Sequence, residues 1–443
     1  MDAHQIKAML NNAISTTIAN IDDYVIHPGR DFRRKRKFPC EKLISFLISE
    51  GSSSTKLEIL DFFNYQTNSI SDAAFIQQRS KLRPEALRQV LCSFNEKALA
   101  SVSHGKYRYI AVDGSTVTYF SNEKYSPEEY HVSEGHSKDG FYSIHINAFQ
   151  DIKTHMYTDL LLQPVHQKDE FKAFATIVDR HPVDPNTKNI YIGDRGYCSY
   201  NNMAHVINAN QYFLFRAKDV TSKGIVMSFD IGKDECCDVW KSVKLTRSHD
   251  KKIFSSSNCR FICDNISFDY IEKGSLKTYD MSFRIVRFKL TDSSYECIIT
   301  NLPSQEFPPE KLKEIYNERW NIESSFRKLK YTIGLNNFHS MKPDFVKQEI
   351  MARIIMYNLT EFTISCTVIG QSAKRKKHTY RANFTMAAHI CRVFFRCTTM
   401  KEDSKDVMKI ISGALIPIRE GRKFPRLQTA HFRKPRYFIY RAA

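Results

Sequence analysis

The chain lacks the features that mark membrane-spanning, secreted or disordered proteins. No run approaches 18 consecutive apolar residues, so no segment is predicted to cross a bilayer. The first residues, MDAHQIKAMLNN, have no basic stretch followed by an apolar core, which argues against a signal peptide. Low-complexity tracts are also absent. We therefore expect a folded cytoplasmic protein with no membrane partner.

The cysteines show no disulfide framework. There are 11 of them, an odd number without regular spacing, which suits a reducing compartment. The nearest approach to a zinc site is Cys236, Cys237, Cys259 and Cys263. Adjacent cysteines followed by a C-x3-C spacing lack the paired C-x2-C knuckles of a structural zinc site. We expect these to be small buried side chains.

Acidic residues are outnumbered by basic ones. Lys and Arg total 66 against 48 Asp and Glu, for a net charge of +18. Such an excess points to a polyanionic partner, with nucleic acid first and an anionic membrane surface second, although a merely well-solvated basic surface is the alternative. Residues 371–443 hold 18 Lys and Arg against 4 acids, interleaved with aromatics. We read this region as a DNA-binding tail rather than a bland basic one.

A second basic cluster lies near the N-terminus. It precedes an apolar helix that ends at Gly51, within a region that reads as helical throughout. In a short helical domain such a cluster favours phosphate contacts over a solvated charge run. The predicted DNA-binding residues here are Arg33, Arg34, Lys35, Arg36 and Lys37.

Apolar patterning predicts an α/β protein with several parts. A helical unit is expected over 71–91, with Ser71 or Ser69 as its N-cap and Pro84 opening a second helix, and the double proline at 308–309 suits another helix start. Strands are expected from residue 107 to a stop at Asp113-Gly114, at 141–151 and 155–163, from residue 189 to a stop at Asp194, and at 211–218, with a helix over 167–181. The predicted division is a helical DNA-binding domain (1–104), a mixed-sheet core (105–219), a β-rich insertion (220–303), the rest of the core (304–370) and a basic helical C-terminal region (371–443).

Two acidic residues follow apolar strands. Asp113 and Asp194 each stand where a strand run meets a glycine-containing turn, in VDGS and GDRG. Carboxylates at the carboxyl ends of strands face the crevice where α/β sheets bind ligands. Asp-Gly is also a common structural turn, so either residue alone is weak evidence. Two such carboxylates in one sheet would form a site together with a third ligand-bearing residue, which must come from elsewhere in the chain.

The segment YNERWNIESSFRKLK, residues 316–330, supplies that partner. If it forms one α-helix, Tyr316, Arg319, Glu323 and Lys330 share a stripe about 60° wide and about 21 Å long. An apolar stripe runs beside it, so the polar stripe borders the core rather than facing away from it. An exposed Arg319–Glu323 ion pair is the alternative. We favour a site at the crevice.

Gathered together, Asp113, Asp194 and Glu323 would repel one another. Two carboxylates about 4 Å apart repel by roughly 4 kcal/mol at an effective dielectric of 20. An all-oxygen set suits two Mg²⁺ or Mn²⁺ ions, which would activate an attacking oxygen and stabilise the leaving oxygen of a phosphodiester. Arg319 and Lys330 would hold flanking phosphates, and Tyr316 would hydrogen-bond another.

These residues resemble a known family. The spacing Tyr316-x2-Arg319-x3-Glu323-x6-Lys330 is similar to the signature of the DDE transposases of bacterial insertion sequences, the IS-four group. VDGSTV and GDRGY resemble that group's first two acidic motifs, and the similarity extends to the N-terminal region. The resemblance implies an RNase H-like core interrupted by the β-rich insertion, with Asp113, Asp194 and Glu323 as metal-binding triad.

The resemblance also implies a function. Tyr316, Arg319 and Lys330 would contact the transposon end, and Arg195 is a further candidate phosphate contact or an ion-pair partner. Which of Trp240, Trp320 and Tyr295 stacks on a flipped base is left open. We expect cut-and-paste transposition by a homodimer on terminal inverted repeats, near the bacterial nucleoid. A transposase-derived DNA-binding protein and an RNase H-like nuclease without strand transfer are the alternatives.

Overall fold

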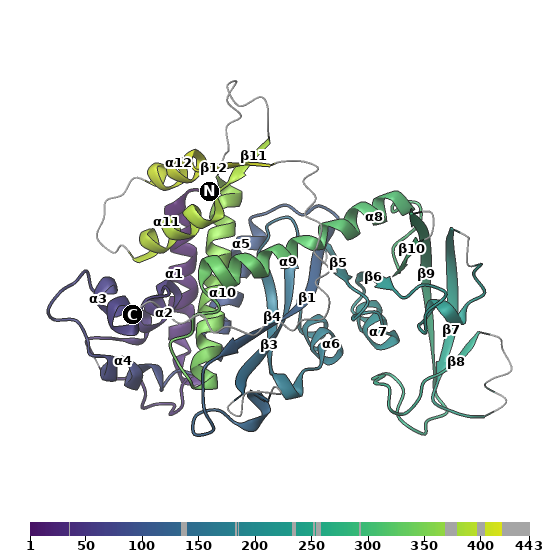
Figure 1. The fold of residues 1–443 in the computed structure, drawn as a ribbon, viewed down its shortest axis with the longest axis horizontal. Coiled ribbons are helices and arrows are strands. Elements are labelled where there is room, and N and C mark those ends of the chain that lie inside the picture. The colour runs from purple at the N-terminus through teal and green to yellow at the C-terminus, as the bar shows by residue number, and fades with distance from the viewer. Residues whose placement is uncertain are drawn as a thin grey trace.

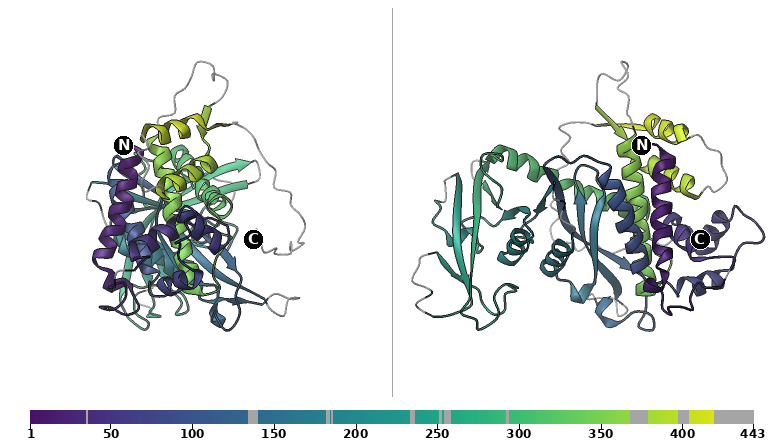
Figure 2. Two further views of the ribbon diagram at one scale, coloured as in Figure 1. Left: turned by 90° about the vertical axis from the view of Figure 1, so that its left-hand side faces the viewer. Right: turned by 180° about the vertical axis from the view of Figure 1, so that it is seen from behind.

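The computed structural model describes residues 1–34, 36–133, 140–181, 184, 186–232, 236–250, 253, 258–291, 294–367, 379–396 and 404–418. Its centre is a ten-stranded mixed sheet (Figure 1). A helical bundle lies at one end of this sheet and the β-rich strands lie at the other (Figure 2). The α/β fold class predicted from the sequence is therefore confirmed.

The N-terminal region is helical, as predicted. Its helices are α1 (Ala3–Ala19), α2 (Cys40–Ser49), α3 (Thr55–Phe62), α4 (Asp72–Arg79) and α5 (Glu85–Ala100). Ser71 caps α4, since its side chain accepts a hydrogen bond from the backbone N–H of Ala74. Pro84 stands at the N-cap of α5. Local cap signals thus placed both helix starts correctly.

The core sheet has the RNase H-like order. Strands β1 (Tyr107–Tyr119), β3 (Phe141–Asp151) and β4 (Tyr157–Pro164) form an antiparallel meander, extended by the short β2 (His131–Val132). Helix α6 (Glu170–Arg180) leads to β5 (Lys188–Gly193), and α7 (Tyr200–Asn208) leads to β6 (Tyr212–Ala217). Strand β5 pairs in parallel with both β1 and β6. Three antiparallel strands followed by two parallel ones is the arrangement that the resemblance implied.

The β-rich segment continues the same sheet. Its strands are β7 (Cys237–Thr246), β8 (Cys259–Phe261), β9 (Thr278–Thr291) and β10 (Ser294–Thr300). Strand β10 pairs antiparallel with β6, joining residues 297–300 to 214–217. The edge of β6 is thereby covered rather than left to solvent. The segment 220–303 is β-rich as predicted, but it is joined edge to edge with the core.

The signature segment is not one α-helix. Helix α8 (Pro309–Glu318) ends before Arg319, α9 (Trp320–Arg327) follows, and a π-helical turn runs from Lys328 to Ile333. The turn ends at Gly334, whose φ of +94° falls in the left-handed region that favours glycine. The single-helix prediction for 316–330 is wrong, because it assumed an unbroken 100° step per residue. The double proline does start α8, with Pro308 at its N-cap.

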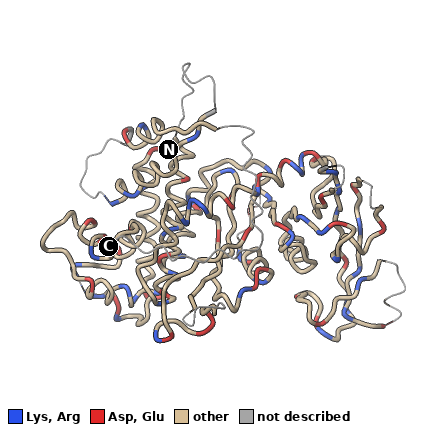
Figure 3. Tube along the Cα trace, in the orientation of Figure 1, with Lys and Arg blue, Asp and Glu red and all other residues tan. Residues whose placement is uncertain are grey.

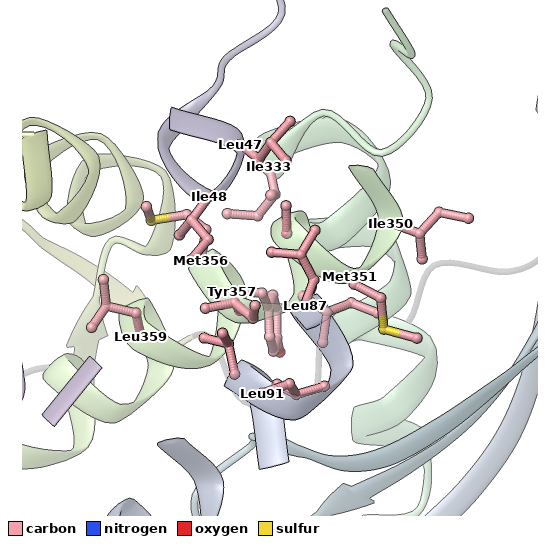
Figure 4. Packing of buried hydrophobic residues seen from close by; sticks show 14 of the residues in the cluster. Leu47, Ile48, Leu87, Leu91, Ile333, Ile350, Met351, Met356, Tyr357 and Leu359 are labelled. Carbon is pink, nitrogen blue, oxygen red and sulfur yellow. The ribbon is translucent and has the colours of Figure 1, made fainter. Parts of the chain in front are cut away.

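The central packing element is α10 (Pro343–Cys366), which is buried on nearly all sides from Phe345 to Thr363. Leu47 and Ile48 of α2, Leu87 and Leu91 of α5, and Ile333 of the π turn pack around Ile350, Met356 and Tyr357 (Figure 4). Burying apolar surface contributes roughly 25 cal/mol per Å². The N-terminal helices and the signature segment therefore share one hydrophobic core.

The C-terminal region is partly built into that core. It comprises β11 (Thr379–Ala382), α11 (Phe384–Arg396), α12 (Ser404–Gly413) and β12 (Leu415–Ile418), with β11 and β12 paired. Helix α11 buries Phe384, Ala387 and Cys391 against the main cluster. Two helices agree with the predicted helical character. Most of the basic residues predicted to form a tail, at 371–378, 397–403 and 419–443, lie outside the described residues.

Candidate active site

Asp113 lies within β1 rather than at its end. The predicted stop at Asp113-Gly114 is wrong, because β1 continues to Tyr119 through antiparallel pairing with β3. Parallel pairing with β5 nevertheless ends at Ala111. Asp194 comes directly after Gly193, the last residue of β5, as predicted. The two carboxylates therefore stand beside the point where the parallel pair β1–β5 ends.

Arg319 connects Asp113 to Glu323. Its Nη1 lies 3.9 Å from Asp113 Oδ2 and its Nη2 lies 3.5 Å from Glu323 Oε1. The Arg319 side chain is only 5% exposed, whereas Asp113 is 22% and Glu323 38% exposed. One buried guanidinium thus bridges the first and third predicted acids. Breaking the helix after Glu318 places Arg319 at this junction.

The pKa of Asp113 shows that Asp194 also lies near Asp113. The pKa of Asp113 is raised to about 6, first by burial and also by the negative charges of Asp194 and Glu323. Arg319 and the backbone N–H of Gly114 act in the opposite direction. The structure therefore places Asp194 and Glu323 close enough to Asp113 for their charges to act on it. The set consists of carboxylates alone, which offer the oxygen ligands that divalent cations such as Mg²⁺ prefer.

Tyr316 and Lys330 occupy positions that the sequence did not predict. Tyr316 is 2% exposed among the apolar side chains behind β5 and β6, with the Arg319 guanidinium 5.6 Å from its ring centroid. Its hydroxyl lacks a well-aligned hydrogen bond within the described part of the chain. Lys330, on the π turn, donates a hydrogen bond of 3.0 Å to the backbone carbonyl of Thr116. Tyr316 contacts Arg319 and Lys330 contacts the backbone of β1, so neither is shown facing solvent, and their DNA contacts stay predictions.

The remaining basic candidates lie on the surface. Arg195 is exposed beside Asp194. Arg33 is exposed and pairs with Asp22, and Lys37 donates to the carbonyl of Ser69 at 3.5 Å. Arg34 and Arg36 are exposed, whereas Lys35 lies outside the described residues. These positions are compatible with phosphate contacts, which stay untested.

The three aromatic candidates for base stacking are in different settings. Trp320 is 43% exposed and has the Arg319 guanidinium 4.9 Å from its ring centroid. Trp240 on β7 is 49% exposed, and its Nε1 donates to Ser304 Oγ at 3.1 Å. Tyr295 on β10 stacks against the Arg287 guanidinium at 3.8 Å. Of the three, Trp320 directly adjoins the acidic group.

Sequence reasoning missed Glu170 and the residues that hold it. Glu170 opens α6, and its Oε1 lies 3.0 Å from both His145 Nε2 and Lys168 Nζ. These contacts lower the pKa of Glu170 to about 2, with the His145 hydrogen bond the largest cause. Burial raises the pKa of Tyr197, and the charges of Glu170, Asp113 and Asp194 raise it further. No spacing rule pointed to these residues, because they come from separate elements.

A second group of potential metal ligands lies elsewhere. Among the described residues, Glu50, His339 and Glu349 offer ligand atoms within 4.8 Å of one another. Arg79 pairs with Glu349 at 3.0 Å, and Arg353 lies 3.8 Å from the same carboxylate. Two buried guanidinium groups already balance the two carboxylates, so a divalent cation would add uncompensated charge. We interpret this group as an ionic link between the N-terminal helices and α10.

The fold and this site define a mixed α/β protein with a partly exposed acidic group around a buried arginine. A family model for the transposase DDE domain matches residues 104–359, more than half of the chain. The chain belongs to this transposase family, and the family prediction made from the signature residues is confirmed.

One relative and one solved structure are similar to the chain. The transposase InsG for insertion sequence element IS4 of Escherichia coli (strain K12) is 25% identical over 137 residues, covering 28% of this chain and 29% of the relative. The match therefore spans under a third of that relative's length. A cryo-EM structure of a piggyBac transposase synaptic complex with hairpin DNA is 10% identical, with a TM-score of 0.44, over 95% of this chain and 87% of that one. That score is too low to support a conclusion.

No helix in the described part of the chain combines the length and hydropathy needed to cross a membrane. The described cysteines are all free thiols. Among the four cysteines considered for zinc, Cys236 and Cys263 are exposed while Cys259 is buried and Cys237 half-buried. The prediction of small buried side chains is therefore wrong for Cys236 and Cys263, which sit at strand ends where local hydrophobicity does not determine burial.

Proposed function

We propose that this protein is a DNA transposase that cuts an insertion sequence at its ends and joins the 3′-hydroxyls to target DNA. The observation that carries this proposal is the contact of Asp113 and Glu323 with one buried guanidinium, with Asp194 close enough to raise the pKa of Asp113, in a chain of the transposase DDE family. A carboxyl whose pKa is raised by burial and by neighbouring acids is typical of a functional site.

Asp113, Asp194 and Glu323 would hold two Mg²⁺ or Mn²⁺ ions. A purely carboxylate set matches the oxygen preference of these ions and disfavours zinc or copper. When bound, such ions favour deprotonation of the attacking oxygen and neutralise charge on the phosphodiester. The partial burial of Asp113 strengthens its electrostatic contacts relative to those in open solvent.

The basic residues of this chain would orient the DNA. Arg319 pairs with both the Asp113 and the Glu323 side chains, so a phosphate bound at these acids would lie near its guanidinium. Arg195 and Lys330 would contact phosphates on either side. Charges of both signs are interspersed along the described elements (Figure 3), so orientation depends on these particular side chains rather than on one broad basic face.

DNA binding away from the acids would use the two basic regions. Exposed Arg33, Arg34, Arg36 and Lys37 would contact the terminal inverted repeat, together with Lys35 and the basic stretch 371–443. Each neutralised phosphate contributes about −0.9 to the slope of log K against log salt. A homodimer would pair two ends in a synaptic complex, in the cytoplasm at the bacterial nucleoid. A flat salt titration of DNA binding would contradict these contacts.

The decisive experiment separates metal-dependent cutting from DNA binding. We expect Asp113→Asn, Asp194→Asn and Glu323→Gln to abolish Mg²⁺-dependent nicking of labelled end DNA while leaving end binding largely intact. Glu314→Gln is the matched control, since Glu314 is an exposed acid on the neighbouring helix α8. Near wild-type nicking by any of the three variants would refute the assignment.

The same assay distinguishes the two alternatives. Nicking without joining of the 3′-hydroxyl to a target duplex would indicate a nuclease of the same fold. End binding without any nicking, with all three acids in place, would indicate a DNA-binding protein derived from a transposase.

A further inference from the structure

Glu170 presents one carboxylate oxygen to His145 and Lys168, and its other oxygen lies near the turn that carries Asp194. Its Oε1 lies 3.0 Å from His145 Nε2 and 3.0 Å from Lys168 Nζ. Its Oε2 faces the turn after β5: a Cβ built on Gly196 would lie 3.8 Å from Glu170 Oε2 and 3.0 Å from Asp194 Oδ1. The two acids therefore flank the same small residue, and Glu170 lies on the Asp194 side of the centre.

Gly114 allows this close approach. A Cβ at this position would lie 2.7 Å from both Glu170 Oε1 and His145 Nε2, closer than side-chain carbons come to such atoms. The Glu170–His145 pair is thus pressed against the backbone of β1 directly after Asp113. His145 is itself fixed, since its Nδ1 lies 3.0 Å from Thr116 Oγ1. Glu170 is held in place by groups from β1, β3 and the start of α6.

Tyr197 provides independent evidence for a ligand. The side chain is 2% exposed, and its hydroxyl has no hydrogen-bond partner within the described residues. Leaving a buried hydroxyl unpaired costs about 1–3 kcal/mol. Tyr197 lies in the same turn as Asp194, since its backbone N–H donates to the Asp194 carbonyl at 3.1 Å. Burial raises the pKa of its hydroxyl, and the charges of Glu170, Asp113 and Asp194 raise it further. A polar atom kept in that position without a protein partner points to a bound ligand.

We propose that Glu170 is a fourth acidic residue of the centre, and that Glu170 Oε2 and the Tyr197 hydroxyl hydrogen-bond the water shell of a divalent cation held by Asp194. This inference rests on the proposed function. Glu170 is then a positioning residue: it contributes negative charge and a hydrogen-bond acceptor without displacing Asp194 as ligand. Outer partners of this kind typically change metal affinity by 10- to 100-fold.

The test is Mn²⁺ binding to the full-length protein without DNA, measured by the loss of the free-ion signal in electron paramagnetic resonance. Glu170→Gln keeps an oxygen for His145 and Lys168 but removes the charge, and we expect Mn²⁺ affinity to fall about 10- to 100-fold. Tyr197→Phe removes a single buried oxygen, and we expect a fall of about 10-fold. Glu96→Gln is the matched control, an exposed acid on α5, with unchanged affinity expected.

Thermal melting separates this role from a structural one. If the Tyr197 hydroxyl served no ligand, Tyr197→Phe would raise the melting temperature and leave Mn²⁺ affinity at the wild-type value, which would overturn the inference. Wild-type affinity in Glu170→Gln would overturn it as well, provided that Asp194→Asn loses binding. A different result, no Mn²⁺ binding by the wild type or full binding by Asp194→Asn, would refute the proposed metal centre itself.

Discussion

Replacing Arg319 tests whether the acids depend on a single buried counter-charge. Arg319→Met removes the guanidinium charge while keeping an unbranched side chain between Tyr316 and Trp320. Without divalent ions, the variant removes the positive charge that pairs with Asp113 and Glu323, while the charges of Asp194 and Glu323 still act on Asp113. We expect it to be less stable than the wild type, and we expect Mg²⁺ to restore part of the loss.

The magnitude follows from the Asp113 contact. At the 3.9 Å between Arg319 Nη1 and Asp113 Oδ2, two unit charges attract by about 4 kcal/mol at an effective dielectric of 20. Solvent screens the Arg319–Glu323 contact, since the Glu323 side chain is 38% exposed, so this contact adds little to the loss of stability. A net loss of about 3 kcal/mol agrees with the cost of removing one partner of a buried pair. At about 2.1 cal/mol/K for each of 443 residues, Tm falls by about 3 °C.

The assay is thermal and urea denaturation with EDTA or with Mg²⁺. Arg327→Met is the control, because Arg327 is an exposed arginine at the end of the same helix. The stability gap between Arg319→Met and the wild type should be largest in EDTA and should shrink as Mg²⁺ is added. An equal gap under both conditions would refute the reasoning, since the acids would then bind no cation that can replace the guanidinium.

Three further predictions concern single residues. Burial lowers the pKa of His181 from its usual 6.5 to about 4, so the unfolded chain takes up the proton first as pH falls. The contribution of His181 to stability is complete above about pH 6.5 and declines by up to about 3 kcal/mol towards pH 4. His181→Gln should flatten that decline in urea titrations across this pH range. Gly114→Ala should displace the Glu170–His145 pair and cost about 1–3 kcal/mol, seen as a lower Tm together with weaker Mn²⁺ binding; an unchanged Tm would contradict the close contact. Ile350→Ala, in the fully buried face of α10, should cost about 2–5 kcal/mol in urea denaturation without changing Mn²⁺ affinity.

Local sequence signals predicted the helices and strands whose ends are marked by capping residues, prolines or turn motifs. Ser71, Pro84 and Pro308 start helices where cap and proline preferences place them, and Asp194 follows β5 directly. The three acids were also predicted to form one group, because the signature spacing and the two strand-end motifs could be read without knowing the fold. These features depend on a few neighbouring residues, which is the range over which sequence preference acts.

Features set by distant pairing could not be predicted. Strand β1 passes through Asp113-Gly114 because β3, about 30 residues later, supplies antiparallel partners up to Tyr119. The break at Arg319 separates α8, whose Leu312 belongs to one apolar cluster, from α9, whose Phe326 belongs to another, and such packing is not visible in local sequence. Glu170 was missed since its neighbours Gly114, His145 and Asp194 come from three separate strands or turns.

The pairing of β10 with β6 has a mechanical consequence. Paired strands connect β1 through β5 and β6 to β10 and β9, so among the described strands the acidic centre and the outer β-rich strands belong to one sheet. If a DNA duplex contacted both ends of this sheet, the distance between the two contacts would be set by the width of the sheet. The distance from the DNA site contacted by the outer strands to the position of cutting would then be set by the sheet as well.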